Sequence, residues 1–197
     1  MTASAKTVPA IGFITVCEHA ELGLFGGYLV LNAAGRPLEF HCTAPVKPNR
    51  TQEILYGAML KPFLYGEQIG QTLLAKAKVT PLVVCTDQSA ILAAREFSDV
   101  PLLQVLEAKG TGKGAKDAER SGGPDDAERR HESYANHSLV EFELGRNRVA
   151  VHALHSSDQP LIIDRWQPHA ELLDLLEPFC RIREALEEAQ RSVRAAA

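Results

Sequence analysis

Acidic residues stand where predicted strands and helices begin or end. Glu18 follows an apolar run at residues 11–17, and Asp87 follows another at residues 81–86. Glu53 lies in the first turn of a predicted helix. If the two apolar runs form neighbouring parallel strands, Glu18 and Asp87 meet at their carboxyl ends, where α/β sheets commonly form sites. Three such carboxylates could hold one or two magnesium ions, and paired metals stabilise the attacking and leaving oxygens of phosphodiester hydrolysis.

The same three residues admit a purely structural interpretation. Glu18 can be a solvated residue at a strand end, and Glu53 can be an acid that favours the first turn of a helix. Asp87 can be the N-cap of a helix over residues 88–97. The residue types alone leave both interpretations open.

Histidines and cysteines form a second candidate cluster at predicted strand ends. Imidazole and thiolate together favour zinc, but the spacing here is not a recognised zinc pattern, and scattered core residues are the simpler interpretation. The four cysteines are far apart and form no CxxC pair, which predicts buried, reduced thiols. The residues in question are Cys17, His19, His41, Cys42, Cys85, His152, His155 and, elsewhere in the chain, Cys180.

The elements that must position these groups follow from hydrophobic periodicity. The first 108 residues spell the order β-β-β-α-β-α-β, in which the strand–helix–strand units imply parallel crossovers. A hairpin and a closing helix interrupted by Pro178 follow. The predicted strands cover residues 11–17, 28–32, 38–43, 81–86, 101–106, 139–144 and 149–154, and the predicted helices cover 51–78, 88–97 and 168–194.

A change in composition interrupts this order. Residues 109–136 are rich in glycine and charged residues and offer almost nothing to bury, so we expect a disordered insert. The remainder has the size and the 45% hydrophobic content of one compact domain over residues 8–197.

The charge balance narrows the classes of partner. The chain has 21 basic and 25 acidic residues, a net charge of −4, so no global positive field attracts nucleic acid. A nucleic-acid partner would have to use a local patch: Lys47, Arg50 and Lys61 flank the carboxylates, whereas Arg146 and Arg148 lie in a remote turn.

The chain has no apolar run long enough to span a bilayer and no secretory pattern at its start, so we expect a cytoplasmic protein without a membrane partner. The oligomeric state cannot be read from the sequence.

Short motifs over residues 11–106 resemble the ribonuclease H-like fold. They are Gly26-Gly27-Tyr28, Asn49-Arg50-Thr51-Gln52-Glu53 and Thr86-Asp87-Gln88-Ser89. The resemblance implies an α/β fold with a mixed five-stranded sheet and flanking helices, to which the sequence pattern adds a C-terminal hairpin and long helix.

The same resemblance implies a magnesium-dependent nuclease core with acids on the first strand, the first helix and after the fourth strand. At these positions stand Glu18, Glu53 and Asp87. The family's first acid is an aspartate, whereas this chain has Glu18. No matching fourth acid with a histidine loop follows, and Asp158 is a candidate for the fourth acid only by default. The fold also includes proteins that have lost catalysis. The two hypotheses are therefore a metal-dependent nucleic-acid phosphodiester hydrolase, or a degenerate relative of one, and a non-catalytic protein-interaction or regulatory module.

Overall fold

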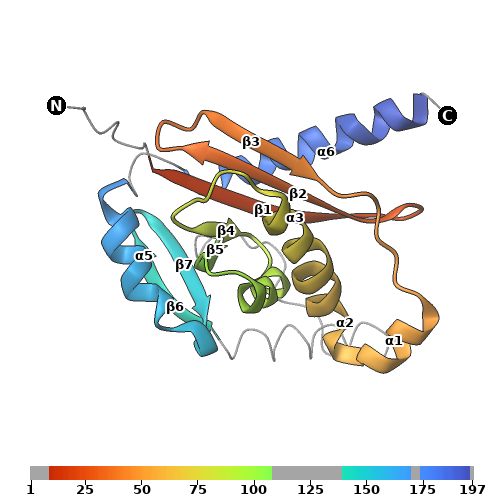
Figure 1. The fold of residues 1–197 in the computed structure, drawn as a ribbon, viewed down its shortest axis with the longest axis horizontal. Coiled ribbons are helices and arrows are strands. Elements are labelled where there is room, and N and C mark those ends of the chain that lie inside the picture. Colours follow the sequence, from red (N-terminus) through yellow and green to blue (C-terminus); the bar gives the residue numbers. More distant parts are fainter. Residues whose placement is uncertain (1–8, 108–138, 170–173, 196–197) are drawn as a thin grey trace, which may run out of the picture.

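A single mixed sheet of seven strands organises the molecule (Figure 1). The structure is a computed structural model that describes residues 9–107, 139–169 and 174–195. The strand order across the sheet is β3-β2-β1-β4-β5-β7-β6. The strands are β1 (Ala10–His19), β2 (Gly23–Asn32), β3 (Pro37–Cys42), β4 (Val84–Thr86), β5 (Leu102–Leu106), β6 (Leu139–Leu144) and β7 (Asn147–His152).

The pairing confirms the α/β class and the parallel contact between the first and fourth strands. β1 pairs antiparallel with β2 along its whole length and parallel with β4, with Ile14 opposite Thr86. The expected C-terminal hairpin is present, but the sheet has seven strands and not five, because β7 pairs antiparallel with β5 and carries the hairpin into the sheet. β7 has a buried centre at residues 149–151, which an isolated hairpin could not provide.

Helical segments connect and cover these strands. A bent helical stretch runs from residue 50 to residue 76, and a 3₁₀-helix follows β4. The segments are α1 (Arg50–Tyr56), η1 (Gly57–Met59), α2 (Leu60–Pro62), the π-helical η2 (Phe63–Gly70), α3 (Gln71–Lys76), η3 (Ser89–Phe97), η4 (Ala153–His155), α5 (Asp158–Trp166), η5 (Gln167–His169) and α6 (Glu177–Ala195).

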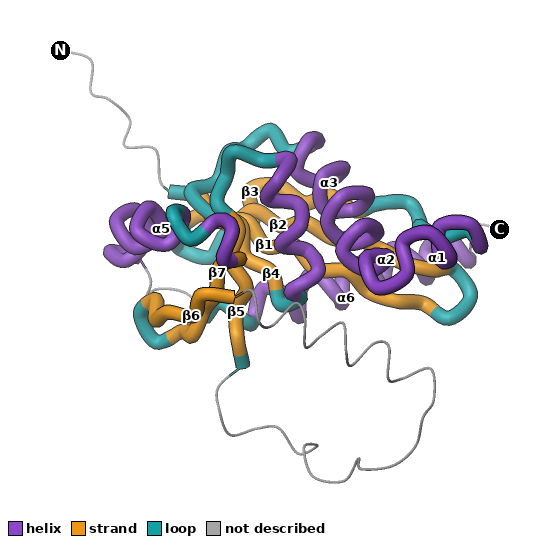
Figure 2. Tube along the Cα trace, turned by 90° about the horizontal axis from the view of Figure 1, so that it is seen from below, coloured by secondary structure: helices purple, strands orange, loops and turns teal. Residues whose placement is uncertain are grey.

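Two adjacent glycines of β2 show which helix covers which face of the sheet. A Cβ atom on Gly26 would lie 2.1 Å from Ile69 of η2, and one on Gly27 would lie 2.3 Å from Ile182 of α6. Successive residues of a strand point to opposite faces, so η2 and α6 pack on opposite faces (Figure 2). A larger residue at either position would clash with these isoleucine side chains, which would have to shift.

Each face has its own hydrophobic core. The α6 side buries Phe13, Cys85, Trp166 and Phe179, and the aromatic rings of Phe13 and Phe179 meet edge to face at 5.6 Å. The η2 side buries a separate set that includes Tyr65 and other residues of η2, η3 and the sheet. We therefore refer below to the α6 face and the η2 face.

The glycines within the long helical stretch have a packing role. A Cβ atom on Gly66 would lie 2.6 Å from Ala93 of η3, and one on Gly70 would lie 2.9 Å from Ala94. The close approach of η2 to η3 holds together a helix that its glycines weaken by about 1 kcal/mol each.

The C-terminal region differs from the expectation. The predicted helix over residues 168–194 begins only at Glu177, and Pro178 lies in its first turn, where a missing N–H costs no hydrogen bond. The helix α5 was missed, although Ile162 and Trp166 stand four residues apart and are both buried. The expected insert at residues 109–136 lies outside the described residues. Among the described helices, none is long and apolar enough to cross a membrane.

Candidate functional site

The carboxyl ends of β1 and β4 lie side by side, and a side chain extends their contact. Gln88, two residues beyond β4, accepts a hydrogen bond from the Val16 N–H at 2.9 Å. Its amide nitrogen donates to the Val16 carbonyl at 3.0 Å. The Gln88 amide thus takes the place of a backbone peptide in the ladder and fixes Asp87 beside the end of β1.

Glu18 lies on the η2 face of this edge. It is exposed at the end of β1, and its carboxylate accepts a hydrogen bond from the hydroxyl of Tyr65, a buried residue of η2. The hydrogen bond ties the strand end to η2. Glu18 is therefore a strand-end residue whose carboxylate bonds to a side chain of the neighbouring helix.

Asp87 lies on the α6 face. Its Oδ2 accepts a hydrogen bond from the guanidinium of Arg183 in α6, an ion pair with side chains 14% and 43% exposed. Among the described residues, the other oxygen, Oδ1, is buried without a hydrogen-bond partner. Asp87 and Glu18 are thus separated by the sheet, contrary to the expected convergence.

The expected capping role of Asp87 was also wrong. The N-cap of η3 is Gln88, which makes no capping bond with its side chain. The turn after β4 is closed by Thr86, whose hydroxyl oxygen accepts from the Gln88 N–H at 3.2 Å. The Asp87 carboxylate is therefore committed to Arg183 and not to a helix end.

Thr15 and Cys17, near the carboxyl end of β1, lie on the α6 face with Asp87. Ile14 pairs with Thr86, so Thr15 stands at the next step of the register, beside Asp87. The Thr15 hydroxyl is buried without a hydrogen-bond partner among the described residues. Burial raises the pKa of the Cys17 thiol, and the nearby Arg183 opposes that shift only in part. A neutral hydroxyl and a neutral thiol thus occupy the positions from which β1 could reach Asp87.

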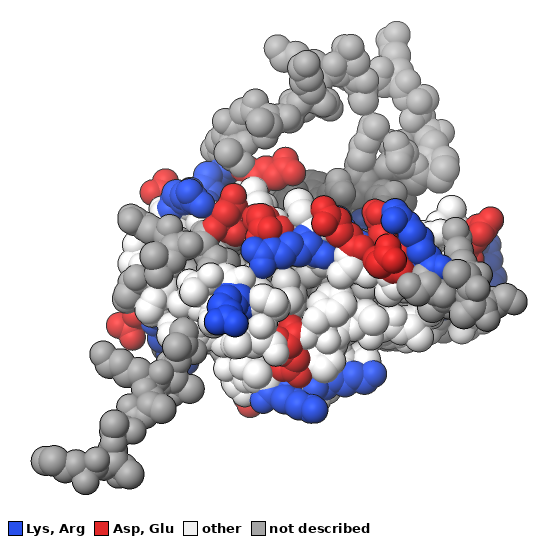
Figure 3. Space-filling view, turned by 90° about the horizontal axis from the view of Figure 1, so that it is seen from above, with Lys and Arg blue, Asp and Glu red and all other residues white. Residues whose placement is uncertain are grey.

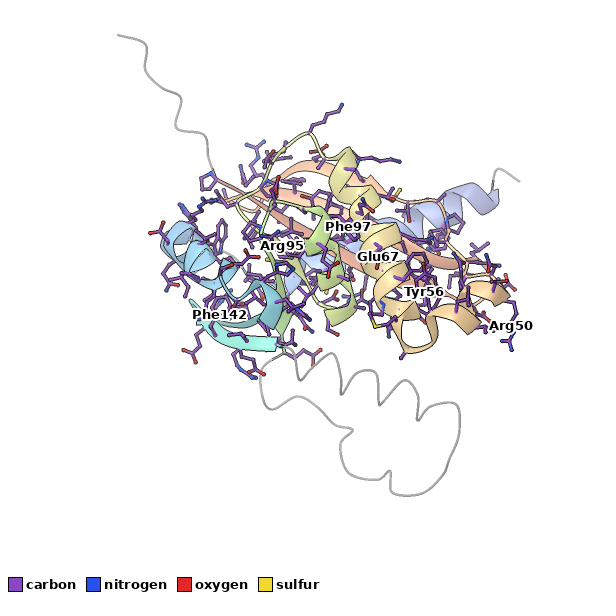
Figure 4. All side chains as sticks on the ribbon, turned by 60° about the horizontal axis from the view of Figure 1, so that its bottom comes forward. Arg50, Tyr56, Glu67, Arg95, Phe97 and Phe142 are labelled. Carbon is purple, nitrogen blue, oxygen red and sulfur yellow. The ribbon has the colours of Figure 1, made fainter. Side chains whose placement is uncertain are left out.

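Glu53 lies apart from both acids. It is exposed on α1, at the projecting end of the helical stretch, and pairs with Arg50 at 3.1 Å (Figure 1). Figure 4 places Arg50 at the outer end of α1, away from the sheet. The structure does not bring the three expected ligands together.

These residues do not fit a magnesium ion. Magnesium requires several oxygen ligands in octahedral geometry, and carboxylates supply most of the charge that holds it. One oxygen of Asp87 is bonded to the guanidinium of Arg183, and no residue of β1 on the same face of the sheet is an acid. In the described part of the chain, no three His, Cys, Asp or Glu residues are grouped to hold a metal ion. That Glu18, Glu53 and Asp87 share a metal stays a prediction, and this geometry does not favour it.

The histidines at the strand ends serve local structure. His19 Nδ1 accepts two backbone N–H groups of the turn that follows β1, and His152 Nδ1 accepts the Leu154 N–H. His41 lies 2.5 Å from the carboxylate of Glu39. All four cysteines are free thiols, but only Cys85 is fully buried, so the expectation that all are buried was wrong.

Asp158, the candidate for the fourth acidic residue of the site, is bonded to Arg95. It is 1% exposed and accepts two hydrogen bonds from the Arg95 guanidinium, at 2.7 and 3.0 Å. The pair joins α5 to η3, and Figure 4 shows Arg95 in this region. Asp158 therefore fixes the packing of α5 and does not extend the candidate site.

Alternation along β1 was the one sequence signal that could have separated Glu18 from Asp87. Phe13, Thr15 and Cys17 share one face of the strand, and Glu18 belongs to the other. No sequence pattern indicates that Arg183 or Tyr65 is the partner of either acid, because both contacts join segments far apart in the chain.

The comparisons with known proteins give distant structural neighbours. No protein-family model and no curated protein matches the sequence. One similar solved structure is that of human ENDOV, whose sequence is 14% identical. The match covers 94% of this chain and 87% of that chain, with a TM-score of 0.42. Another is the structure of Ciona intestinalis endonuclease V in complex with a 23-mer DNA that contains an inosine followed by a ribo-adenosine. Its sequence is 14% identical, and the match covers 76% of this chain and 73% of that chain, with a TM-score of 0.37. A complex of the same Ciona protein with a 24-mer DNA has a TM-score of 0.34. At this distance, the functional conclusion depends on the geometry of the site.

Proposed function

We propose that this chain is a degenerate member of the ribonuclease H-like fold that acts by binding a partner protein and not by cleaving nucleic acid. The observation that carries this proposal is the pairing of Asp87 with Arg183 on one face of the sheet while Glu18 lies on the other. The fixed cation of the arginine neutralises the carboxylate that a catalytic metal would need. The strand order β3-β2-β1-β4-β5 supports the fold assignment.

The distribution of charge favours a protein over a nucleic acid as the partner. Acidic and basic side chains are interleaved on the face that Figure 3 shows, and along α6 Arg181 pairs with Glu177 and Arg191 with Glu187. Phosphate binding needs cations whose charge is available to phosphates, because the affinity comes from the release of condensed counterions. Paired arginines on a chain of net charge −4 do not provide such a field.

A cleavage assay tests the proposal. Labelled single-stranded and duplex DNA, RNA, and inosine-containing DNA are incubated with the full chain in magnesium or manganese, beside an Asp87→Asn variant. We expect the two proteins to leave every substrate equally intact. Cleavage by the parent that Asp87→Asn abolishes would overturn the proposal and establish the metal-dependent hydrolase in its place.

A further inference from the structure

The sheet ends at β3 on one side, and this edge strand exposes apolar side chains. Leu38 and Phe40 are 48% and 41% exposed, and Cys42 is exposed as well. Figure 1 shows β3 along the outer margin of the sheet, and Figure 3 shows, from above, a broad area without charged side chains on this side. β6, the other edge strand of the described sheet, instead exposes Glu141 and Glu143. Charged side chains commonly keep an edge strand from pairing with another chain, and the exposed positions of β3 have none.

Phe40 and Cys42 point to the α6 face of the sheet. Phe40 pairs with Leu29, which belongs to the core on the α6 side. Cys42 pairs with Gly27, at which a Cβ atom would meet Ile182 of α6. Residues directly opposite each other on paired strands share a face. The apolar surface of the α6 face therefore continues past the core to the edge strand, where Phe40 and Cys42 are accessible to solvent.

The outer side of β3 carries backbone groups with which no described strand pairs. On the inner side, the Thr43 N–H donates to the Gly26 carbonyl at 3.0 Å. In an antiparallel pair, successive residues direct their N–H and C=O groups to alternate sides of the strand. Because Thr43 bonds to β2, the backbone groups of Cys42 point outward, and those of Phe40 do the same. The register of β3 on β2 shifts only at residues 37–39, before this stretch.

A second copy of β3 matches this edge. Only an extended strand offers N–H and C=O groups at the spacing of a sheet edge, so the partner must pair as a strand. In an antiparallel pair about Phe40, each ring lies opposite Phe40 of the partner subunit, and Cys42 lies opposite Leu38 of the partner subunit. Two-fold pairing therefore brings the exposed apolar residues of both copies together.

The titratable residues of β3 select this register. Glu39 already bonds to His41 of its own chain at 2.5 Å. Pairing about Phe40 places Glu39 opposite His41 of the partner subunit, so that carboxylates and imidazoles alternate. Pairing about Glu39 or about His41 would instead bring two carboxylates or two imidazoles together, and like charges opposite each other destabilise a sheet.

We propose that β3 forms the interface of a two-fold symmetric homodimer, in which two β3 strands pair antiparallel about Phe40 and join the two sheets into one. The contact closes after two copies, because each β3 edge is used once. This inference names the partner of the binding role proposed above and rests on it. The cleavage assay reports on catalysis alone, so a failure of either proposal is recognisable separately.

Sedimentation equilibrium of the full chain over a range of concentrations tests the interface. We expect a monomer–dimer equilibrium for the parent and a monomer for Phe40→Lys, which places two cations together at the axis. Phe97→Lys is the matched control, because Phe97 is 47% exposed on η3, which packs on the other face of the sheet, and should leave the dimer unchanged. Circular dichroism should show the same fold in all three proteins, since both phenylalanines lie outside the two cores.

A proline variant separates the pairing of strands from contact between side chains alone. Phe40→Pro and Phe40→Val both replace the ring by a smaller apolar side chain, but only proline removes the outward N–H. Proline is tolerated on an edge strand where the lost N–H faces away from the sheet, so both variants should fold, which circular dichroism checks. The dissociation constant should be about tenfold or more higher for Phe40→Pro than for Phe40→Val, because each dimer loses two hydrogen bonds.

Cross-linking tests the register. Under mild oxidation, Phe40→Cys in a Cys42→Ala background should form a disulfide between subunits, because the two copies of residue 40 lie opposite each other at the axis. Cys42→Ala alone keeps the other three cysteines and is the control, which should form none. A parent that stays monomeric, a dimer indifferent to Phe40→Lys, equal dissociation constants for Phe40→Pro and Phe40→Val, or no disulfide at residue 40 would each overturn the proposal.

Discussion

Removal of either member of the Asp87–Arg183 pair distinguishes a structural ion pair from a vacated metal site. In Arg183→Met the aliphatic stem is kept and the cation is lost. This leaves Asp87, whose side chain is 14% exposed, with neither oxygen paired among the described residues. Exposed ion pairs contribute about 0.2–1 kcal/mol, whereas breaking a fully buried pair costs about 3–5 kcal/mol. The partial burial here places the expected loss at about 2 kcal/mol, between these two limits.

The reverse change should cost less. In Asp87→Asn the amide oxygen can still accept a hydrogen bond, and Arg183, 43% exposed, remains accessible to water. We expect a loss of about 1 kcal/mol, by analogy with measured exposed pairs. The double variant should be more stable than the sum of the single losses implies, because it leaves no unpaired charge, and the non-additivity should be about 1 kcal/mol.

Urea unfolding of the four proteins, with and without millimolar magnesium, provides the measurement. Arg191→Met is the matched control on the same helix, because its pair with Glu187 is exposed on both sides and should contribute less than about 0.5 kcal/mol. Magnesium should change none of the midpoints. Additive losses would refute the pairing argument. Stabilisation of the parent by magnesium that disappears in Asp87→Asn would restore the metal site.

The remaining predictions concern two other buried or multiply bonded carboxylates. Arg95→Met should lower the free energy of unfolding in urea by about 3–4 kcal/mol, because it strands Asp158, which is 1% exposed; a loss below about 1 kcal/mol would contradict this. Burial raises the pKa of Glu39, but hydrogen bonds from His41 and the Val79 N–H outweigh burial and lower the pKa to about 2 from 4.5. This carboxylate therefore stabilises the fold above about pH 4.5 and loses that effect as the pH falls towards 2, so the unfolding free energy of Glu39→Gln should fall less steeply over this window than that of the parent.

The sequence by itself determined the class of the fold and most of its strands. Apolar runs and β-branched residues located β1, β4 and β5, because a strand buried on both faces needs a continuous apolar segment. The order of elements was sufficient to place β1 beside β4 in parallel. It was not sufficient to attach the hairpin to β5, because edge pairing depends on which backbone groups are still free when the sheet assembles.

The candidate site depended on tertiary structure for a physical reason that Glu18 and Asp87 illustrate. Sequence order indicates that two strand ends are close. The face of the sheet to which each side chain points depends on the strand register, because a shift of one residue turns the side chain to the opposite face. The partners of the two acids, Tyr65 and Arg183, come from helices 47 and 96 residues away in the chain. The register of β1 and β4 put the two carboxylates on opposite faces, and the packing of η2 and α6 on those faces decided which partner each one would bond.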